Sequence, residues 1–93
     1  MNEVLQILRS HKNSLMGKYP ISSLALFGSC SRGDHTPESD VDILVEMNKP
    51  DYSAFANLCY ELEEIIRRKT DLVFKNGVTD RYLKFIEDDL IYV

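Results

Sequence analysis

The sequence has little that would commit the protein to a membrane, to secretion or to a disulfide scaffold. Its 93 residues include no Trp, four Gly, three Pro and two Cys. No apolar run approaches the roughly 20 residues of a transmembrane helix, and no secretory h-region is evident. Cys30 and Cys59 lack the spacing of a zinc site or a C-x-x-C redox motif. Since small reduced chains rarely use a single bridge, we expect two reduced thiols in a cytoplasmic protein with no membrane role.

The sequence is also short of basic residues. Lys and Arg number 11 against 15 Asp and Glu, which gives a net charge of −4. A protein that binds nucleic acid through overall electrostatic attraction needs a basic surface, so direct nucleic-acid binding is not expected. A composition of 44% hydrophobic and 28% charged residues is that of a soluble globular chain, and we expect residues 1–93 to form one domain. Because a chain this short buries a limited share of its surface, contact with a partner or a homo-oligomer would add stability.

One stretch carries recognisable chemistry: a Gly-Ser turn after an apolar run, and a carboxylate pair that opens a second apolar run. Asp40 and Asp42 are two positions apart, so in a strand their side chains point to the same face. Two such carboxylates repel each other unless a cation lies between them. Their hard oxygen atoms suit Mg²⁺, which completes its shell with water and phosphate oxygens. In the Gly28-Ser29 turn, glycine lets backbone N–H groups approach a phosphate, and the serine hydroxyl adds a donor.

Hydrophobic periodicity predicts helices alternating with strands, and therefore an α/β fold. Helices are expected over residues 2–18, about 51–69 and 79–88, and strands over about 23–27, 40–46 and 70–74. A short helical turn is expected after Ser29, and the segment 90–93 is expected to pack locally, add an edge strand or meet a partner. The second strand is apolar on both faces beyond its first residues, which suits a central strand with the site at one end.

Several side chains have roles that the pattern leaves open or assigns more simply. We expect Asp51 or Ser53 to cap the second long helix, and Arg67 and Arg68 to lie largely on its solvated face. The last helix is expected to pack through Tyr82, Leu83, Phe85 and Ile86. Arg32 is expected to contact phosphate or to pair with Asp34 or Glu38 in its own loop. From spacing alone, Asp71 at the head of the third strand is equally a site carboxylate or a structural strand-edge residue.

The motif stretch resembles the signature of the nucleotidyltransferase superfamily related to DNA polymerase beta. That signature is Gly-Ser, ten residues, then Asp-x-Asp, and Gly28-Ser29 with Asp40-x-Asp42 matches it at that spacing. The resemblance covers nearly the whole chain. It implies a small nucleotidyltransferase fold of the α/β (α+β) class, with a small mixed β-sheet and helices packed mainly on one face.

The finer pattern is similar to the minimal nucleotidyltransferase (MNT) subfamily. Arg32, Gly33 and Ser39 match this pattern, while Ser31 stands where alanine is usual. The resemblance therefore implies a nucleotide-binding set made of Gly28, Ser29, Arg32, Gly33 and Ser39. It also places Asp71 as a third carboxylate.

With Asp71 added, the resemblance implies that Asp40, Asp42 and Asp71 are catalytic and would hold two Mg²⁺ ions around ATP, the substrate. A two-metal site stabilises both the attacking and the leaving oxygen of an in-line displacement. Asp71 is also the candidate to help deprotonate the attacking hydroxyl. The structural expectation from this assignment is that the three carboxylates converge.

MNT proteins resemble antitoxins that transfer AMP from ATP to a tyrosine of a HEPN-domain ribonuclease toxin. The leading hypothesis is therefore a Mg²⁺-dependent nucleotidyltransferase that adenylylates a HEPN-type partner, with the acceptor supplied by another molecule or a second copy. The rival hypothesis is a non-catalytic antitoxin that inhibits its partner by contact. Three converging charges favour the enzyme, because a pure binding module has no use for them. Modification of a small molecule such as an aminoglycoside is a weaker alternative, since no acceptor pocket is evident.

Overall fold

The computed structural model describes residues 3–93, and its helices and strands alternate as the sequence predicts. The helices are α1 (Glu3–Lys18), α2 (Gly28–Arg32), α3 (Tyr52–Ile66) and α4 (Asp80–Ile86), with 3-10 turns η1 (Lys75–Gly77) and η2 (Glu87–Asp89). The strands are β1 (Ile21–Phe27), β2 (Val41–Met47), β3 (Thr70–Phe74) and β4 (Ile91–Tyr92). No helix within residues 3–93 is long and apolar enough to cross a membrane.

The four strands form one mixed sheet in the order β3-β2-β1-β4. β1 pairs antiparallel with β2 and β4, whereas β2 and β3 are parallel and are connected through α3. The C-terminal segment takes one of its three predicted roles, because β4 pairs with β1 at the sheet edge and the Val93 N–H donates to the Leu24 carbonyl at 2.9 Å. The central place of β2 is the one its two apolar faces predict.

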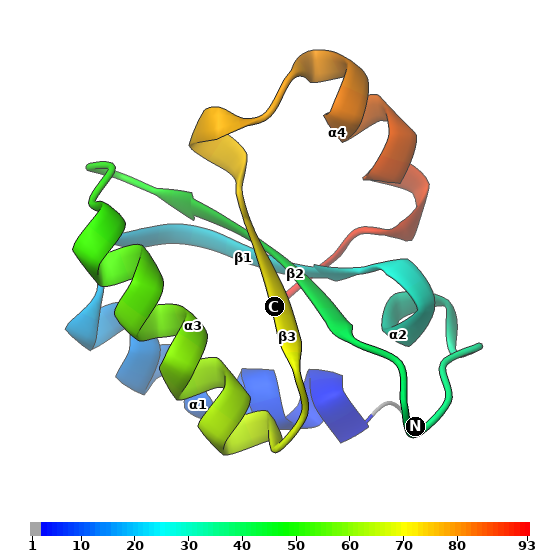
Figure 1. Ribbon diagram of the computed structural model, residues 1–93. Helices are drawn as coiled ribbons and strands as arrows, with labels where there is room; N and C mark the ends of the chain where they lie inside the picture. The colour runs from blue at the N-terminus through cyan, green and yellow to red at the C-terminus, as the bar shows by residue number, and fades with distance from the viewer. Residues whose placement is uncertain (1–2) are drawn as a thin grey trace.

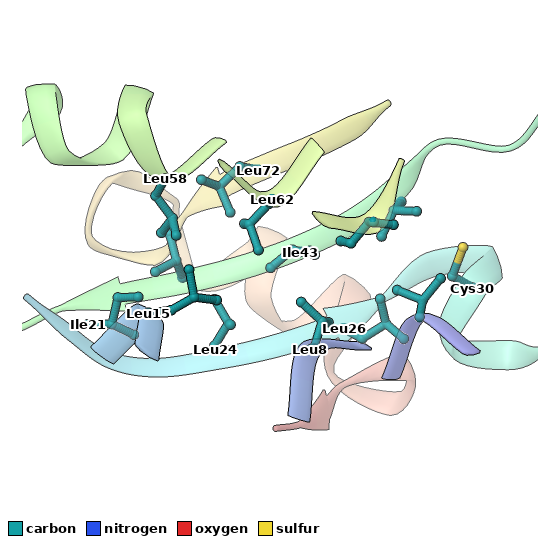
Figure 2. Close-up of a cluster of buried hydrophobic side chains, with 14 of the residues drawn as sticks. Leu8, Leu15, Ile21, Leu24, Leu26, Cys30, Ile43, Leu58, Leu62 and Leu72 are labelled. Carbon is teal, nitrogen blue, oxygen red and sulfur yellow. The ribbon is translucent and has the colours of Figure 1, made fainter. Parts of the chain in front are cut away.

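The two long helices α1 and α3 cover one face of the sheet, so the expected fold is confirmed (Figure 1). Figure 2 shows the core between them, where Leu8 of α1 and Leu62 of α3 point toward Ile43 of β2. The other face carries a smaller cluster of Ala25, Phe27, Leu44 and Ile86 under the short helix α4. The smaller cluster does not include the first residues of β2 and β3, where polar side chains lie.

Two element boundaries differ from the predicted ones because of backbone conformation. α3 ends at Ile66 and not near residue 69, since Arg67 adopts a left-handed conformation with φ 60° that terminates the helix. β2 begins at Val41, so Asp40 lies just before the strand and not within it. The predicted start of the first helix at residue 2 lies outside the described residues.

The other ends shift by similar amounts. β1 begins at Ile21, directly after Pro20 and earlier than predicted. α4 is shorter than predicted at both ends, because Thr79 accepts a hydrogen bond from the Tyr82 N–H as the N-cap and η2 replaces the last turn.

The packing of α4 corrects one prediction. Tyr82, Leu83 and Ile86 face the sheet, but Phe85 is 84% exposed and does not pack there. Residue 85 is rotated by roughly 100° from residue 86 around the helix, which turns Phe85 away from the small cluster. Cys30 and Cys59 form no disulfide bond within the described chain, as predicted.

The Asp51 side chain caps α3, because its carboxylate accepts a hydrogen bond from the Ala54 N–H at 3.1 Å. We expect Asp51→Ala to lower the free energy of unfolding by about 1 kcal/mol, and Asp51→Asn to retain most of the stability. Urea unfolding measures both. Ser53→Ala, two residues further on, is the control and should change stability by less than about 0.5 kcal/mol. A loss for Ser53→Ala equal to that for Asp51→Ala would contradict the assignment of the cap.

Candidate active site

Two of the three predicted catalytic carboxylates are brought together by strand pairing. Asp42 of β2 and Asp71 of β3 are register partners in the parallel pair. Parallel strands begin at the same sheet edge, so the connection through α3 returns the chain to the end where Asp42 lies. Asp40 precedes β2 by one residue and is exposed, as is Asp71, while Asp42 is half-buried. The structure thus places Asp71 beside the Asp-x-Asp motif, as the resemblance implies.

Asp42 has the most perturbed environment of the three. Burial raises the pKa of the Asp42 carboxyl, and the negative charges of Asp71 and then Asp40 raise it further. The positive charge of Arg32 opposes this shift. Negative charge is therefore concentrated at this end of the strands, where a cation would be stabilised.

The Gly28-Ser29 turn touches the carboxylate site directly. Gly28 has φ 72°, a left-handed conformation that favours glycine, and a Cβ atom there would overlap Asp42 Oδ2. The chain then continues into α2, the short helical turn predicted after Ser29. Glycine is consequently required at position 28 for two independent reasons, backbone conformation and the close approach of Asp42.

Arg32 takes a partner that the sequence did not indicate. Its guanidinium donates to Asp34 Oδ2 at 3.1 Å, as one alternative predicted, and to Asp89 Oδ2 of η2 at 2.7 Å, while Glu38 is not its partner. The Ser31 hydroxyl donates to the Asp89 backbone carbonyl. Serine in place of the alanine usual in MNT proteins therefore supplies a hydrogen bond between α2 and η2. Arg32 would contact a phosphate only by sharing or leaving these carboxylates.

The loop before Asp40 is held by Arg68, which we had predicted to lie in solvent. Arg68 Nη2 donates to the carbonyls of Thr36 and Ser39, both at 2.7 Å. The Ser39 hydroxyl accepts a hydrogen bond from the Thr36 N–H at 2.9 Å. Ser39, predicted to bind nucleotide, thus stabilises the turn from Thr36 to Ser39 in this structure. The sequence could not indicate that Arg68 binds this loop. The contact depends on the left-handed conformation of Arg67, which sets the direction of the chain at Arg68.

Tyr82 of α4 is a further residue that sequence reasoning did not place at the site. Burial raises the pKa of the Tyr82 phenol, and the charges of Asp71 and Asp42 raise it further. A helix residue eleven positions after Asp71 therefore lies in the field of both carboxylates. The only available signal was its place on the packed face of the last helix.

The donor set fits Mg²⁺. Asp40, Asp42 and Asp71 offer hard carboxylate oxygens, and the charges of Asp71 and Asp40 both act on Asp42. Among residues 3–93, however, no group of three His, Cys, Asp or Glu side chains is arranged so that it could hold a metal ion, so the expected convergence of the three carboxylates is not observed. The joint metal role of the three carboxylates therefore stays a prediction.

Acidic side chains on neighbouring strands, beside a glycine turn, are the arrangement expected of a nucleotidyltransferase site. The family model described as nucleotidyltransferase domain matches residues 8–93. The chain belongs to the nucleotidyltransferase domain family, which confirms the resemblance of its sequence motif.

Relatives and solved structures agree with this family. MJ1379 of Methanocaldococcus jannaschii, named as a protein adenylyltransferase, is 46% identical over 100% of this chain and 97% of its own length. A structure described as a minimal nucleotidyltransferase has a TM-score of 0.76 at 24% identity, covering 94% of this chain and 93% of that one. The matched chain in a complex of tri-AMPylated Shewanella oneidensis HEPN toxin with MNT antitoxin has a TM-score of 0.68 at 20% identity, covering 94% and 69%. The two structures establish the likeness of fold.

Replacing Gly28 tests the contact between the turn and Asp42. We expect Gly28→Ala to lose about 1–2 kcal/mol of unfolding free energy from the left-handed backbone, plus a further loss from overlap with Asp42. Gly33→Ala is the matched control, because Gly33 has φ 82° with no atom close to its Cβ position. Denaturant unfolding should rank Gly28→Ala as clearly more destabilising. Equal losses at the two positions would show that the close approach of Asp42 has no energetic weight.

Removing the charge of Asp42 tests the electrostatic repulsion. A carboxyl whose pKa is raised in the folded state lowers stability when ionised, and this loss vanishes as pH falls through that pKa. We therefore expect Asp42→Asn to raise Tm by a few degrees at pH about 7, with the gain shrinking toward pH about 4. Thermal melts of both proteins without nucleotide measure it. A large fall in Tm would mean that the Asp42 carboxylate is needed for folding.

Proposed function

We propose that this protein is a Mg²⁺-dependent adenylyltransferase that transfers AMP from ATP to a tyrosine of a HEPN-type toxin and so acts as its antitoxin. The observation that carries the proposal is the pairing of Asp42 with Asp71 against Gly28. The name of the 46% identical relative supports protein adenylylation, since the two chains match over their whole lengths. The AMPylated HEPN toxin bound to a structural neighbour supports the kind of partner.

In this proposal, some residues of the chain bind the metal and others position the triphosphate. Asp40, Asp42 and Asp71 would hold Mg²⁺, which when bound neutralises triphosphate charge and stabilises the attacking and leaving oxygens. Gly28 brings the backbone of the turn close to the carboxylates, so a triphosphate that contacts this turn lies beside them. Ser29 would donate a hydrogen bond to a β- or γ-phosphate oxygen.

The transfer itself needs little covalent chemistry from the protein. The phenolic oxygen of the acceptor attacks the α-phosphorus of ATP, the bond from that phosphorus to the bridging oxygen breaks, and pyrophosphate leaves. Asp71, which is exposed near the start of β3, would accept the phenolic proton. Docking of a folded partner would supply the orientation that the reaction requires.

The decisive experiment is intact-mass spectrometry of the HEPN partner after incubation with this protein, ATP and Mg²⁺. We expect the partner to gain one or more AMP units with the wild-type chain and none with Asp40→Asn, Asp42→Asn. Glu38→Gln, which removes one acidic charge at an exposed position of the same loop, is the control and should modify the partner normally. A partner that stays unmodified yet is inhibited equally by wild type and double mutant would establish the rival hypothesis, inhibition by contact alone.

A further inference from the structure

Tyr82 lies on the same face of the sheet as the two paired carboxylates. It packs with Leu44 and Val73 in the small cluster beneath α4. Leu44 and Val73 follow Asp42 and Asp71 by two positions on β2 and β3, so all four side chains point to one face. The helix therefore holds the Tyr82 ring one step along the strands from the carboxylates. Figure 1 shows α4 on the side of the sheet away from α1 and α3.

The Tyr82 hydroxyl is not committed to another contact. It forms no hydrogen bond with any residue between 3 and 93, whereas the Tyr19 hydroxyl donates to Glu61 at 2.8 Å. The charges of Asp71 and Asp42 both act on the Tyr82 phenol. The hydroxyl is therefore free to act as an acceptor within electrostatic range of the two carboxylates.

A pocket of about 580 Å³ adjoins the ring of Tyr82. Arg81 and Lys84 line it with positive charge, and Phe85, 84% exposed, lines it with an aromatic ring. Cationic side chains suit a phosphate, and an aromatic face suits a purine base. The volume lies in the range of small-ligand sites. An adenylyl group attached to Tyr82 would be able to bind in this pocket.

From this juxtaposition we propose that Tyr82 is a self-modification site, adenylylated in cis by the protein's own transfer centre. The proposal rests on the proposed AMP transfer and adds an acceptor within the chain. The Tyr82 phenolic oxygen forms a bond to the α-phosphorus of ATP as the bond to the bridging oxygen breaks. Pyrophosphate leaves, and the phenolic proton passes to the Asp71 carboxylate. The product is a phosphodiester on α4 that occupies the place of an incoming acceptor.

The test uses the full chain alone with ATP and Mg²⁺, without any partner. We expect intact mass to rise by one AMP unit and peptide mapping to place it on Tyr82. The rate constant should be independent of protein concentration, because the acceptor and the transfer centre belong to one molecule. Tyr82→Phe and Asp42→Asn should each abolish the gain. Tyr60→Phe, at a 72% exposed tyrosine on α3, is the control and should leave it intact.

Direct mapping of the wild-type chain keeps the proposal falsifiable even if Tyr82→Phe folds poorly. AMP on a residue other than Tyr82, or a rate that rises with protein concentration, would overturn it. A wild-type preparation that modifies the HEPN partner while its own Tyr82 stays unmodified would overturn the inference and leave the proposed function standing. If neither the partner nor Tyr82 gains AMP, the proposed function fails as well.

Discussion

The packing of the sheet holds two like charges next to each other. Asp42 and Asp71 are register partners on parallel strands, and neither can move away without breaking the ladder that joins β2 to β3. Val41 and Ile43, which flank Asp42, are fully buried on the opposite face under α1 and α3. Burial of these apolar side chains stabilises the strand strongly enough to retain the repulsion at its end. The core on one face of the sheet thus fixes the electrostatics of the other.

The Gly-Ser turn is held in place by a segment far from it in sequence. Asp89 of η2 accepts a hydrogen bond from Arg32 at 2.7 Å and, through its carbonyl, one from Ser31. β4 then anchors η2 to the edge of the sheet through pairing with β1. The position of α2, and hence of the Gly-Ser turn, is therefore linked to the last residues of the chain. Substitutions in η2 would therefore shift the Gly-Ser turn indirectly, through α2.

The sequence sufficed for features that local rules determine. Alternation along β2 correctly assigned Asp42 and Leu44 to one face. The place of Asp71 beside Asp42 followed from the family resemblance, because spacing alone left the role of Asp71 open. Helix periodicity failed at Phe85, which lies on the side of α4 turned away from the small cluster. Exact strand and helix ends were also missed, since they follow from single dihedral angles.

Contacts between segments far apart in the sequence could not be predicted from the sequence. The role of Arg68 requires both the left-handed turn at Arg67 and the path of the loop through Thr36 and Ser39. The pairing of Arg32 with Asp89 requires knowing that the chain returns to α2 after α4. Neither arrangement has a periodic signature, because each joins irregular segments whose relative positions are set by the whole sheet.

The charge of the site implies that metal and nucleotide would bind together. Asp42 already experiences the charges of Asp71 and Asp40, with Arg32 as the cation that opposes them. Arg32 in turn is neutralised by Asp34 and Asp89. A triphosphate arriving alone would add negative charge to an end of the sheet that already has an excess. A cation arriving with it would relieve both repulsions at once, so each ligand would raise the affinity for the other, and the coupling would be reciprocal.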